Sequence, residues 1–125
     1  MDEVGKVKIT TYRDLICWQK SMLLVVEVYR QTGKFPKDEI YGLTSQIRRC
    51  AVSIPSNIAE GYGRNSTNDY IRFLQIASGS INELQTQLEI ACNLSYLDRD
   101  CFDVLHENAR EIERMLSVLI KKIRI

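Results

Sequence analysis

The sequence predicts an all-α protein that folds as an antiparallel up-down-up-down four-helix bundle with a proline-kinked second helix. Apolar residues recur at spacings of three and four in four stretches, which is the period of an amphipathic helix. The stretches are joined by short connections, which favour antiparallel neighbours. A chain of 125 residues with 45% hydrophobic side chains is large enough to bury one core without staples. We therefore expect a flexible arm over residues 1–11 and one domain over 12–125, with helices at about 12–32, 38–62, 66–95 and 98–124.

The first helix, over 12–32, carries a regular seam of large apolar side chains. They recur every three or four residues, and we expect them to face the core: Leu15, Trp18, Met22, Val25 and Tyr29. Further apolar residues beside this seam predict that the helix contacts two neighbours. Gly33 ends the helix, and Pro36 prevents it from resuming at once.

The second helix, over 38–62, begins with Asp38 and Glu39, whose negative charge is favoured at a helix N-terminus. Pro55 interrupts the apolar pattern without shifting its phase, so the sequence predicts one kinked helix and not two. Gly61 and Gly63 end the helix. The face expected in the core holds Ile47, Cys50, Ala51, Ile54, Ile58 and Tyr62.

The third and fourth helices, over 66–95 and 98–124, have the most regular patterns. Ser66 and Asp98 are expected to cap them, and Asp69 would complete a capping box at the third. The small residues Ser78, Gly79 and Ser80 interrupt the third helix, and Gly79 lowers its helix propensity. A close approach of another helix would explain them, and a tolerated defect is the alternative. The seam of the third helix is Tyr70, Leu74, Ala77, Ile81, Leu84, Leu88 and Ala91. The seam of the fourth is Phe102, Leu105, Ala109, Ile112, Leu116, Leu119 and Ile123.

The overall charge and the cysteines are those of an ordinary cytoplasmic protein. A net charge of +1 gives no long-range attraction to nucleic acid or membrane, so any basic site must be local. We expect neither a signal peptide nor a membrane-spanning segment, because the start MDEVGKVKITTY is polar and no apolar run approaches about 20 residues. The cysteines lack metal-site spacing, and we interpret them as small hydrophobes in a reducing cytoplasm: Cys17, Cys50, Cys92 and Cys101.

The sequence argues against an enzyme. His106 is the only histidine, and it has no obvious serine or cysteine partner for a hydrolytic triad. The single D-x-x-H motif at Asp103 falls short of the carboxylate and histidine set of a di-iron bundle, and no P-loop is present. We therefore predict no catalytic residue, no metal site and no cofactor.

Local basic groups are the candidates for an anion or nucleic-acid site. The exit of the second helix places Gly61, Gly63 and Arg64 just before Ser66 and Thr67, where free N–H groups and an arginine could hold a phosphate. A capped helix start with an exposed arginine is the alternative. The C-terminal turn adds Lys121, Lys122 and Arg124, which also suit a helix C-terminus without any ligand.

Arg48 and Arg49 lie on different faces of the second helix. Arg49 shares a polar stripe with Glu60 and Arg64, where salt links within the chain are an alternative to binding nucleic acid. Arg48 lies on a flank that also carries three residues poorly suited to open solvent: Val52, Pro55 and Ala59. We predict this flank as an oligomer interface with Arg48 pairing across it, and nucleic-acid contact is the competing use.

The chain resembles a bacterial family of four-helix-bundle proteins encoded within intervening sequences of 23S ribosomal RNA genes. The resemblance covers Tyr12 to Leu97, with SIPSNIAEG as its most specific core. The matching segments are YRDLICWQKS, FP at Phe35-Pro36, GLTSQIRRCAVSIPSNIAEGYGR and FLQIASGSINELQTQL.

The resemblance implies a ring-shaped homopentamer of bundles without catalytic activity. The family is also similar to accessory proteins of diversity-generating retroelements, which bind nucleic acid and a reverse transcriptase. Two hypotheses result: a scaffold that contacts RNA or DNA through the basic residues above, or a protein-binding adaptor for a reverse transcriptase or another partner. An undetected enzyme is a third, and the lone histidine argues against it.

Overall fold

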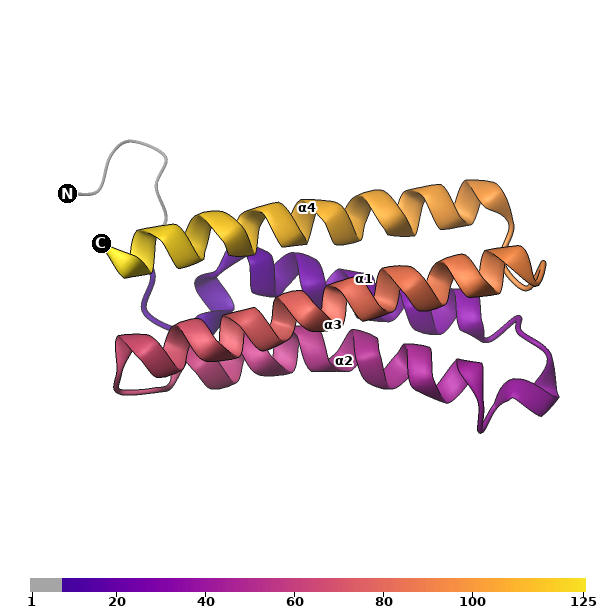
Figure 1. Ribbon diagram of the computed structural model, residues 1–125, viewed down its shortest axis with the longest axis horizontal. Helices are drawn as coiled ribbons and strands as arrows, with labels where there is room; N and C mark the ends of the chain where they lie inside the picture. The colour runs from indigo at the N-terminus through magenta and orange to yellow at the C-terminus, as the bar shows by residue number, and fades with distance from the viewer. Residues whose placement is uncertain (1–7) are drawn as a thin grey trace.

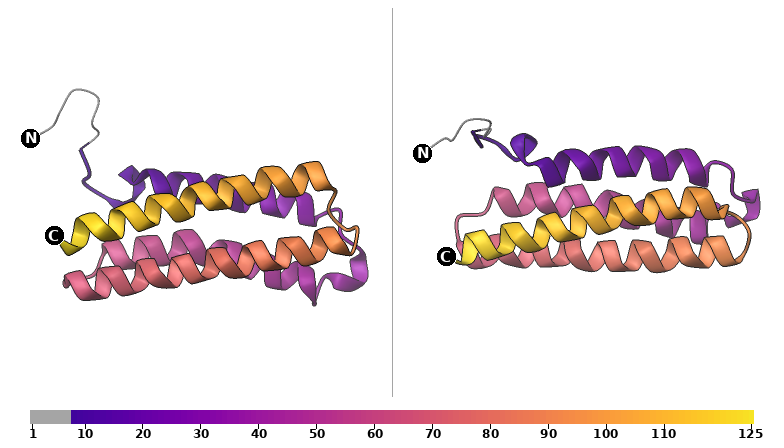
Figure 2. Two further views of the ribbon diagram at one scale, coloured as in Figure 1. Left: turned by 45° about the horizontal axis from the view of Figure 1, so that its top comes forward. Right: turned by 90° about the horizontal axis from the view of Figure 1, so that it is seen from above.

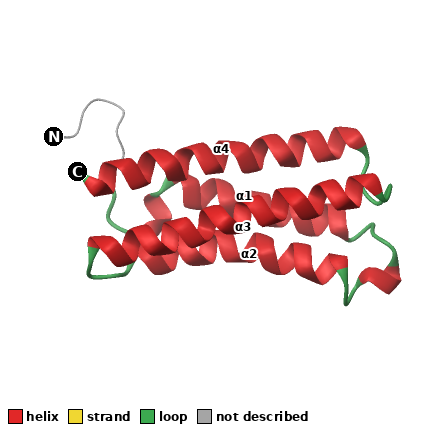
Figure 3. Ribbon diagram, viewed as in Figure 1, coloured by secondary structure: helices red, strands yellow, loops and turns green. Residues whose placement is uncertain are grey.

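The computed structural model describes residues 8–125, which form four long helices joined by short loops (Figures 1 and 3). They are α1 (Ile16–Thr32), α2 (Leu43–Tyr62), α3 (Thr67–Asn93) and α4 (Arg99–Arg124). Short 3-10 turns precede the first two helices: η1 (Tyr12–Asp14) and η2 (Lys37–Glu39). The predicted all-α four-helix fold is confirmed. Of the arm predicted over 1–11, residues 1–7 lie outside the part of the chain that the structure describes.

Consecutive helices run in opposite directions. In Figure 1, α1 and α3 run from left to right, and α2 and α4 return from right to left. The packing neighbours are α1 with α2, α2 with α3, α3 with α4 and α4 with α1, which closes a four-sided bundle (Figure 2). The start of α1, the α2–α3 loop and the C-terminus therefore gather at one end of the bundle.

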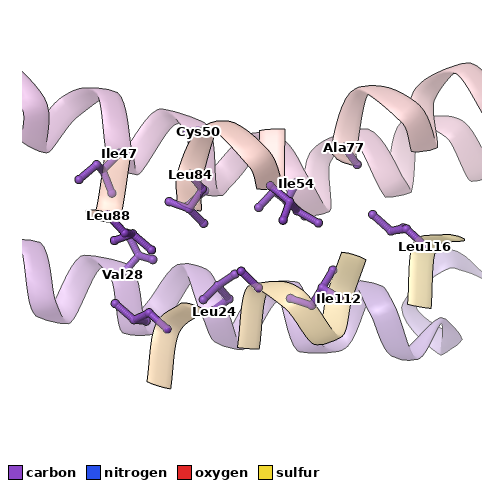
Figure 4. Close-up of a cluster of buried hydrophobic side chains, with 14 of the residues drawn as sticks. Leu24, Val28, Ile47, Cys50, Ile54, Ala77, Leu84, Leu88, Ile112 and Leu116 are labelled. Atoms are coloured by element: carbon purple, nitrogen blue, oxygen red, sulfur yellow. The ribbon is translucent and has the colours of Figure 1, made fainter. Parts of the chain in front are cut away.

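The core runs along the bundle axis and receives side chains from all four helices. Figure 4 shows aliphatic side chains from the facing helices pointing toward one another. Its fully buried members include Val28, Ile47, Ile54, Leu84, Leu88, Leu105, Ile112 and Leu116. Burying one such side chain contributes about 1.5–3 kcal/mol, so this row provides the main stabilisation of the bundle.

The predicted seams of α3 and α4 are confirmed over most of their length. Leu74 to Ala91 on α3 and Phe102 to Leu116 on α4 occupy buried positions at the expected spacing. The Ser66 and Asp98 side chains cap the two helices by accepting the N–H groups of Asp69 and Cys101, at 3.0 and 2.8 Å. Of the small residues 78–80, Gly79 makes no close approach, because a Cβ atom there would have no neighbour within 4 Å, whereas Ser80 contacts α2.

The close helix contact lies at Gly61 instead. A Cβ atom on Gly61 would sit 2.8 Å from Cβ of Phe73 on α3, so only glycine allows α2 and α3 to pack this closely. Nearer the middle of the pair, the Cys50 thiol donates to the Ser80 carbonyl at 3.0 Å. These contacts hold α2 and α3 together as a tightly packed hairpin.

The first helix presents a different face to the core from the one expected. Its buried residues are Cys17, Ser21, Leu24, Val28 and Thr32. Of the predicted seam only Leu15 is buried; Trp18 and Val25 are half-buried, and Met22 and Tyr29 are exposed. The prediction is wrong because α1 is apolar on two faces, and the larger side chains occupy the outer one.

The second helix begins later than predicted. The segment 40–42 separates η2 from α2, and the Glu39 carboxylate accepts the Leu43 N–H at 3.1 Å and the Tyr96 hydroxyl at 2.9 Å. Glu39 therefore caps the start of α2 from outside the helix and, through Tyr96, links the start of α2 to the α3–α4 loop. Helix α2 is continuous through Pro55. The kink at Pro55 stays a prediction.

Candidate functional site

An apolar surface strip runs along the contact between α1 and α2, over a hollow of about 410 Å³. We call it the α1–α2 strip. Helix α1 contributes Trp18, Met22 and Val25, and α2 contributes Val52, Pro55 and Ala59. Tyr12 and Ser56 complete the lining. The flank predicted from Val52, Pro55 and Ala59 is thus continued on α1 by the seam that the sequence had placed in the core.

Two arginines lie beside the ends of the α1–α2 strip. The Arg13 guanidinium lies 5.5 Å from the ring centroid of Tyr12 and 5.7 Å from that of Trp18. At the other end, Arg48 lies 4.5 Å from the ring centroid of Tyr29. Such cation–π contacts hold a guanidinium flat against an apolar surface. The strip therefore combines aromatic, methionine and arginine side chains, the types enriched in protein–protein interfaces.

Arg48 is engaged with the end of α1 in its own chain. Its Nε donates to the Thr32 hydroxyl at 2.9 Å, and Thr32 in turn donates to the Val28 carbonyl at 2.7 Å. The guanidinium also donates to the Tyr29 carbonyl at 3.4 Å. Arg48 therefore fixes α2 against α1, and its pairing across a subunit contact stays a prediction.

The structure brings together only some of the predicted basic residues. Arg64 lies in the α2–α3 loop, at the end of the bundle that also holds Lys121, Lys122 and Arg124 (Figure 1). Among residues 8–125, no carboxylate pairs with the three basic residues of the α4 tail. Arg48 and Arg49 lie apart from this group, in the first two turns of α2.

The predicted anion site in the α2–α3 loop is occupied by contacts within the chain. The Gly63 N–H donates to the Ala59 carbonyl at 3.3 Å, and the Ser66 hydroxyl caps α3. Arg64 pairs with Glu60 at 2.7 Å and lies 4.7 Å from the Phe73 ring centroid. This geometry is that of a capped helix start, the alternative left open by the sequence.

Arg49 lines a polar hollow between α2 and α3. The hollow has a volume of about 360 Å³ and also holds Gln46, Ser53 and the carboxylate of Glu83. The Cys50 thiol lies in the same lining, and burial raises its pKa to about 12. This thiol is protonated at neutral pH and is a poor nucleophile.

The groups considered for catalysis are dispersed. The His106 ring stacks on Phe102 with centroids 5.3 Å apart, which is a packing arrangement. Burial raises the pKa of Cys17 to about 11, so this thiol too is protonated at neutral pH. Across residues 8–125, no three histidine, cysteine, aspartate or glutamate side chains come close enough to hold a metal ion. Within the same residues, no helix is both long and apolar enough to cross a membrane.

Fold and surface together define an all-helical bundle that carries apolar side chains both in its core and on its outer surface, among them those of the α1–α2 strip. The chain belongs to the family of 23S rRNA-intervening sequence proteins, whose model matches residues 13–118. The resemblance identified from the sequence is therefore confirmed.

A solved structure supports the same assignment. The chain is similar to a protein of unknown function from the S23 ribosomal protein family of Bacteroides thetaiotaomicron, known from a crystal structure. The TM-score is 0.77 at 27% identity, over 85% of this chain and 99% of that one. No curated protein matches the chain.

Proposed function

We propose that this protein is a non-enzymatic scaffold whose copies associate through the α1–α2 strip into a ring, the homopentamer that the family resemblance implies. The observation that carries the proposal is the reversal in α1. The side of this helix toward the core holds Cys17, Ser21 and Thr32 beside Leu24 and Val28, whereas Met22 and Tyr29 are exposed and Trp18 is half-buried. A helix that is apolar on more than one face is ordinarily covered on each of them.

The composition of the strip supports a specific contact. Trp18 and the two arginines beside the strip are residue types that dominate binding energy when they become fully desolvated. Burying the exposed part of Met22, which is 42% exposed, would add to the association free energy without changing the core. The strip is present in the folded protomer, so association requires little rearrangement.

Light scattering after size exclusion tests the proposal. We expect a mass several times 14.5 kDa for the natural chain and a monomer for Met22→Lys. The matched control is Ile90→Lys on α3, because Ile90 is 44% exposed but lies outside the strip. A natural chain that is monomeric at micromolar concentration would refute the proposal, as would equal disruption by both variants.

A second candidate function is binding of RNA or DNA at the basic end of the bundle. Its support is the α4 tail, whose basic residues pair with no carboxylate among residues 8–125, beside Arg64, which pairs with Glu60; several acidic residues lie in η2 and at the start of α4, at the other end. The acidic residues are Asp38, Glu39, Asp98, Asp100 and Asp103. This separation produces a local positive field that the net charge of +1 conceals.

Titration of labelled structured RNA and duplex DNA across salt concentrations tests this second function. Lys121→Gln with Lys122→Gln should weaken binding and reduce the salt dependence, because each lost phosphate contact lowers the slope by about one. Arg49→Ala and Arg64→Ala report on the other predicted contacts. Lys34→Gln, at the opposite end, is the control. Absence of binding at low salt would exclude nucleic acid.

A protein-binding adaptor is the alternative to nucleic-acid contact. Its partner would be a reverse transcriptase, as the resemblance implies, or another protein. A pull-down that recovers the same protein after nuclease treatment, and loses it with Met22→Lys, would favour the adaptor over the nucleic-acid scaffold.

A further inference from the structure

A further hollow lies outside the α1–α2 strip, between the start of α1 and the end of α4. Its volume is about 510 Å³, within the range of about 300–1,000 Å³ found for small-molecule sites. The lining is mainly apolar and comprises Leu15, Ile16, Cys17, Met115, Val118 and Leu119. This hollow is on the side of α1 that faces α4, so the proposed subunit contact leaves it open.

Two lining residues are exposed in a way that the bundle core does not explain. Ile16 is 44% exposed and Val118 is 53% exposed, although both belong to long, well-packed helices. They lie on facing helices across the same hollow. An apolar chain placed between them would be covered on two sides and would remove both side chains from water.

The polar groups at this hollow are mainly cationic. Arg114 and Lys122 lie four residues to either side of Val118, so all three share one face of α4. Arg114 uses one guanidinium nitrogen to pair with Glu107 at 3.1 Å, and its other donors are available. Lys122 pairs with no carboxylate among residues 8–125.

The one acidic group in the lining is already neutralised. Glu111 pairs with Lys20 of α1 at 3.3 Å, which ties the two helices together beside the hollow. Glu111 also lines the next hollow along the α1–α4 contact, so this ion pair marks the boundary between the two. The hollow is thus an apolar floor limited at one side by the Lys20–Glu111 ion pair and flanked by Lys122 and by Arg114, which is itself paired with Glu107.

We propose that the hollow between α1 and α4 binds a small anionic amphiphile, a free alkyl carboxylate. Its chain packs between Ile16 and Val118, and its carboxylate pairs with Lys122 or Arg114. The cations select a negative head group, and the apolar lining selects an unbranched chain over a compact anion such as phosphate.

Calorimetric titration with octanoate, decanoate and decanol, each below its micelle concentration, tests the site. We expect saturable binding of one decanoate per chain, and about fourfold tighter binding for each methylene added, the factor that corresponds to about 0.8 kcal/mol per buried CH₂. Decanol should bind about tenfold more weakly than decanoate, because it lacks the charge.

Variants at the hollow separate the two parts of the site. Val118→Asp places a carboxylate in the floor and should abolish binding, while circular dichroism shows an intact fold because Val118 is outside the core. Lys122→Gln should reduce the preference for decanoate over decanol. Lys121→Gln is the matched control, since Lys121 is exposed and outside the lining.

Several outcomes would overturn the proposal. They are the absence of saturable binding, equal effects of Lys121→Gln and Lys122→Gln, and binding only to anionic vesicles. Loss of decanoate binding at high chain concentration, with recovery on dilution, would also overturn it, because the hollow would then be a contact between copies. Each outcome is independent of the α1–α2 strip, since Met22→Lys should leave decanoate binding unchanged.

Discussion

Helices α1 and α4 are neighbours in the same bundle, but they distribute their apolar residues in opposite ways. The buried stripe of α4 consists mainly of large side chains, and its outward positions are mostly charged. The stripe is Phe102, Leu105, Ala109, Ile112 and Leu116. The core face of α1 includes small or polar residues, whereas Trp18, Met22, Leu23 and Val26 face outward or lie at the flanks.

This difference separates two uses of an apolar side chain. In α4 the apolar period identifies the core, and the exposed Val104 and Val118 lie outside that period. In α1, apolar residues at the same spacing lie on two faces of the helix, one that packs in the bundle and one that is available for contacts outside it. The outer face of α1 therefore carries several large apolar side chains, whereas α4 exposes Val104 and Val118 among outward positions that are mostly charged.

The largest expected effect is at the α4 stripe. Leu116 is fully buried, so Leu116→Ala should lower the free energy of unfolding by about 2–5 kcal/mol through lost transfer energy and a residual cavity. Urea denaturation measures the change, with Ser117→Ala on the exposed side as the control. A loss below about 1 kcal/mol would mean that α4 contributes little to the core.

A substitution on the core face of α1 should lower the free energy of unfolding by less, because hydrogen bonds there take the place of large apolar side chains. Thr32→Val removes the hydroxyl that donates to Val28 and accepts from Arg48, and should cost about 1 kcal/mol. The same denaturation experiment measures it. Combined with Arg48→Met, the loss should be less than additive, because the two residues share one bond. Full additivity would show that this bond contributes nothing.

Substitutions on the outer face of α1 should barely change the free energy of unfolding of the monomer. Leu23 is 70% exposed, so Leu23→Gln should change the free energy of unfolding by less than about 0.5 kcal/mol. The measurement belongs in the Met22→Lys background, where the chain is expected to be monomeric. A loss of several kcal/mol would contradict the distinction between the two faces of α1.

The smallest effect concerns the start of α4 in acid. The Cys101 N–H bonded to the Asp98 carboxylate holds the pKa of Asp98 below its ordinary value. Stabilisation by this cap is complete above the ordinary aspartate pKa and is lost as the pH falls through the lower folded pKa. The variant Asp98→Asn keeps a side-chain oxygen that can accept the Cys101 N–H, but this side chain does not titrate.

The free energy of unfolding of Asp98→Asn should therefore fall less steeply in acid than that of the natural chain, as measured by urea denaturation at a series of pH values. Asp14, before α1, has its pKa lowered mainly by the Thr10 N–H and hydroxyl, so part of the acid sensitivity should remain. An unchanged pH profile would show that the Asp98 cap has no role in acid stability.

The sequence predicted the four helices well because each is long and has a sustained apolar period. It misplaced the start of α2, because Glu39 caps Leu43 while binding Tyr96, which is 57 residues away in the chain. Such a contact has no local signature. It also chose the wrong face of α1, since a helix with apolar residues on two faces has no single phase.

The candidate surfaces were predictable in part. Val52, Pro55 and Ala59 do lie together, because residues at these spacings share one face of any helix. Their neighbours on α1 depend on how two helices pack, which the sequence pattern does not specify. The grouping of Arg64 with the α4 tail likewise follows from the alternating direction of the helices and not from their separation along the chain.

The close contact at Gly61 has a consequence for how the chain folds. Helices α2 and α3 are joined by only a few residues, and Gly61 lets them meet at short range near that connection. Contacts of low sequence separation form early, so we expect the α2–α3 hairpin to be the folding nucleus. In stopped-flow refolding, Gly61→Ala should then slow folding more than it speeds unfolding. Helix α1, whose pairing with α4 spans most of the chain, would dock last.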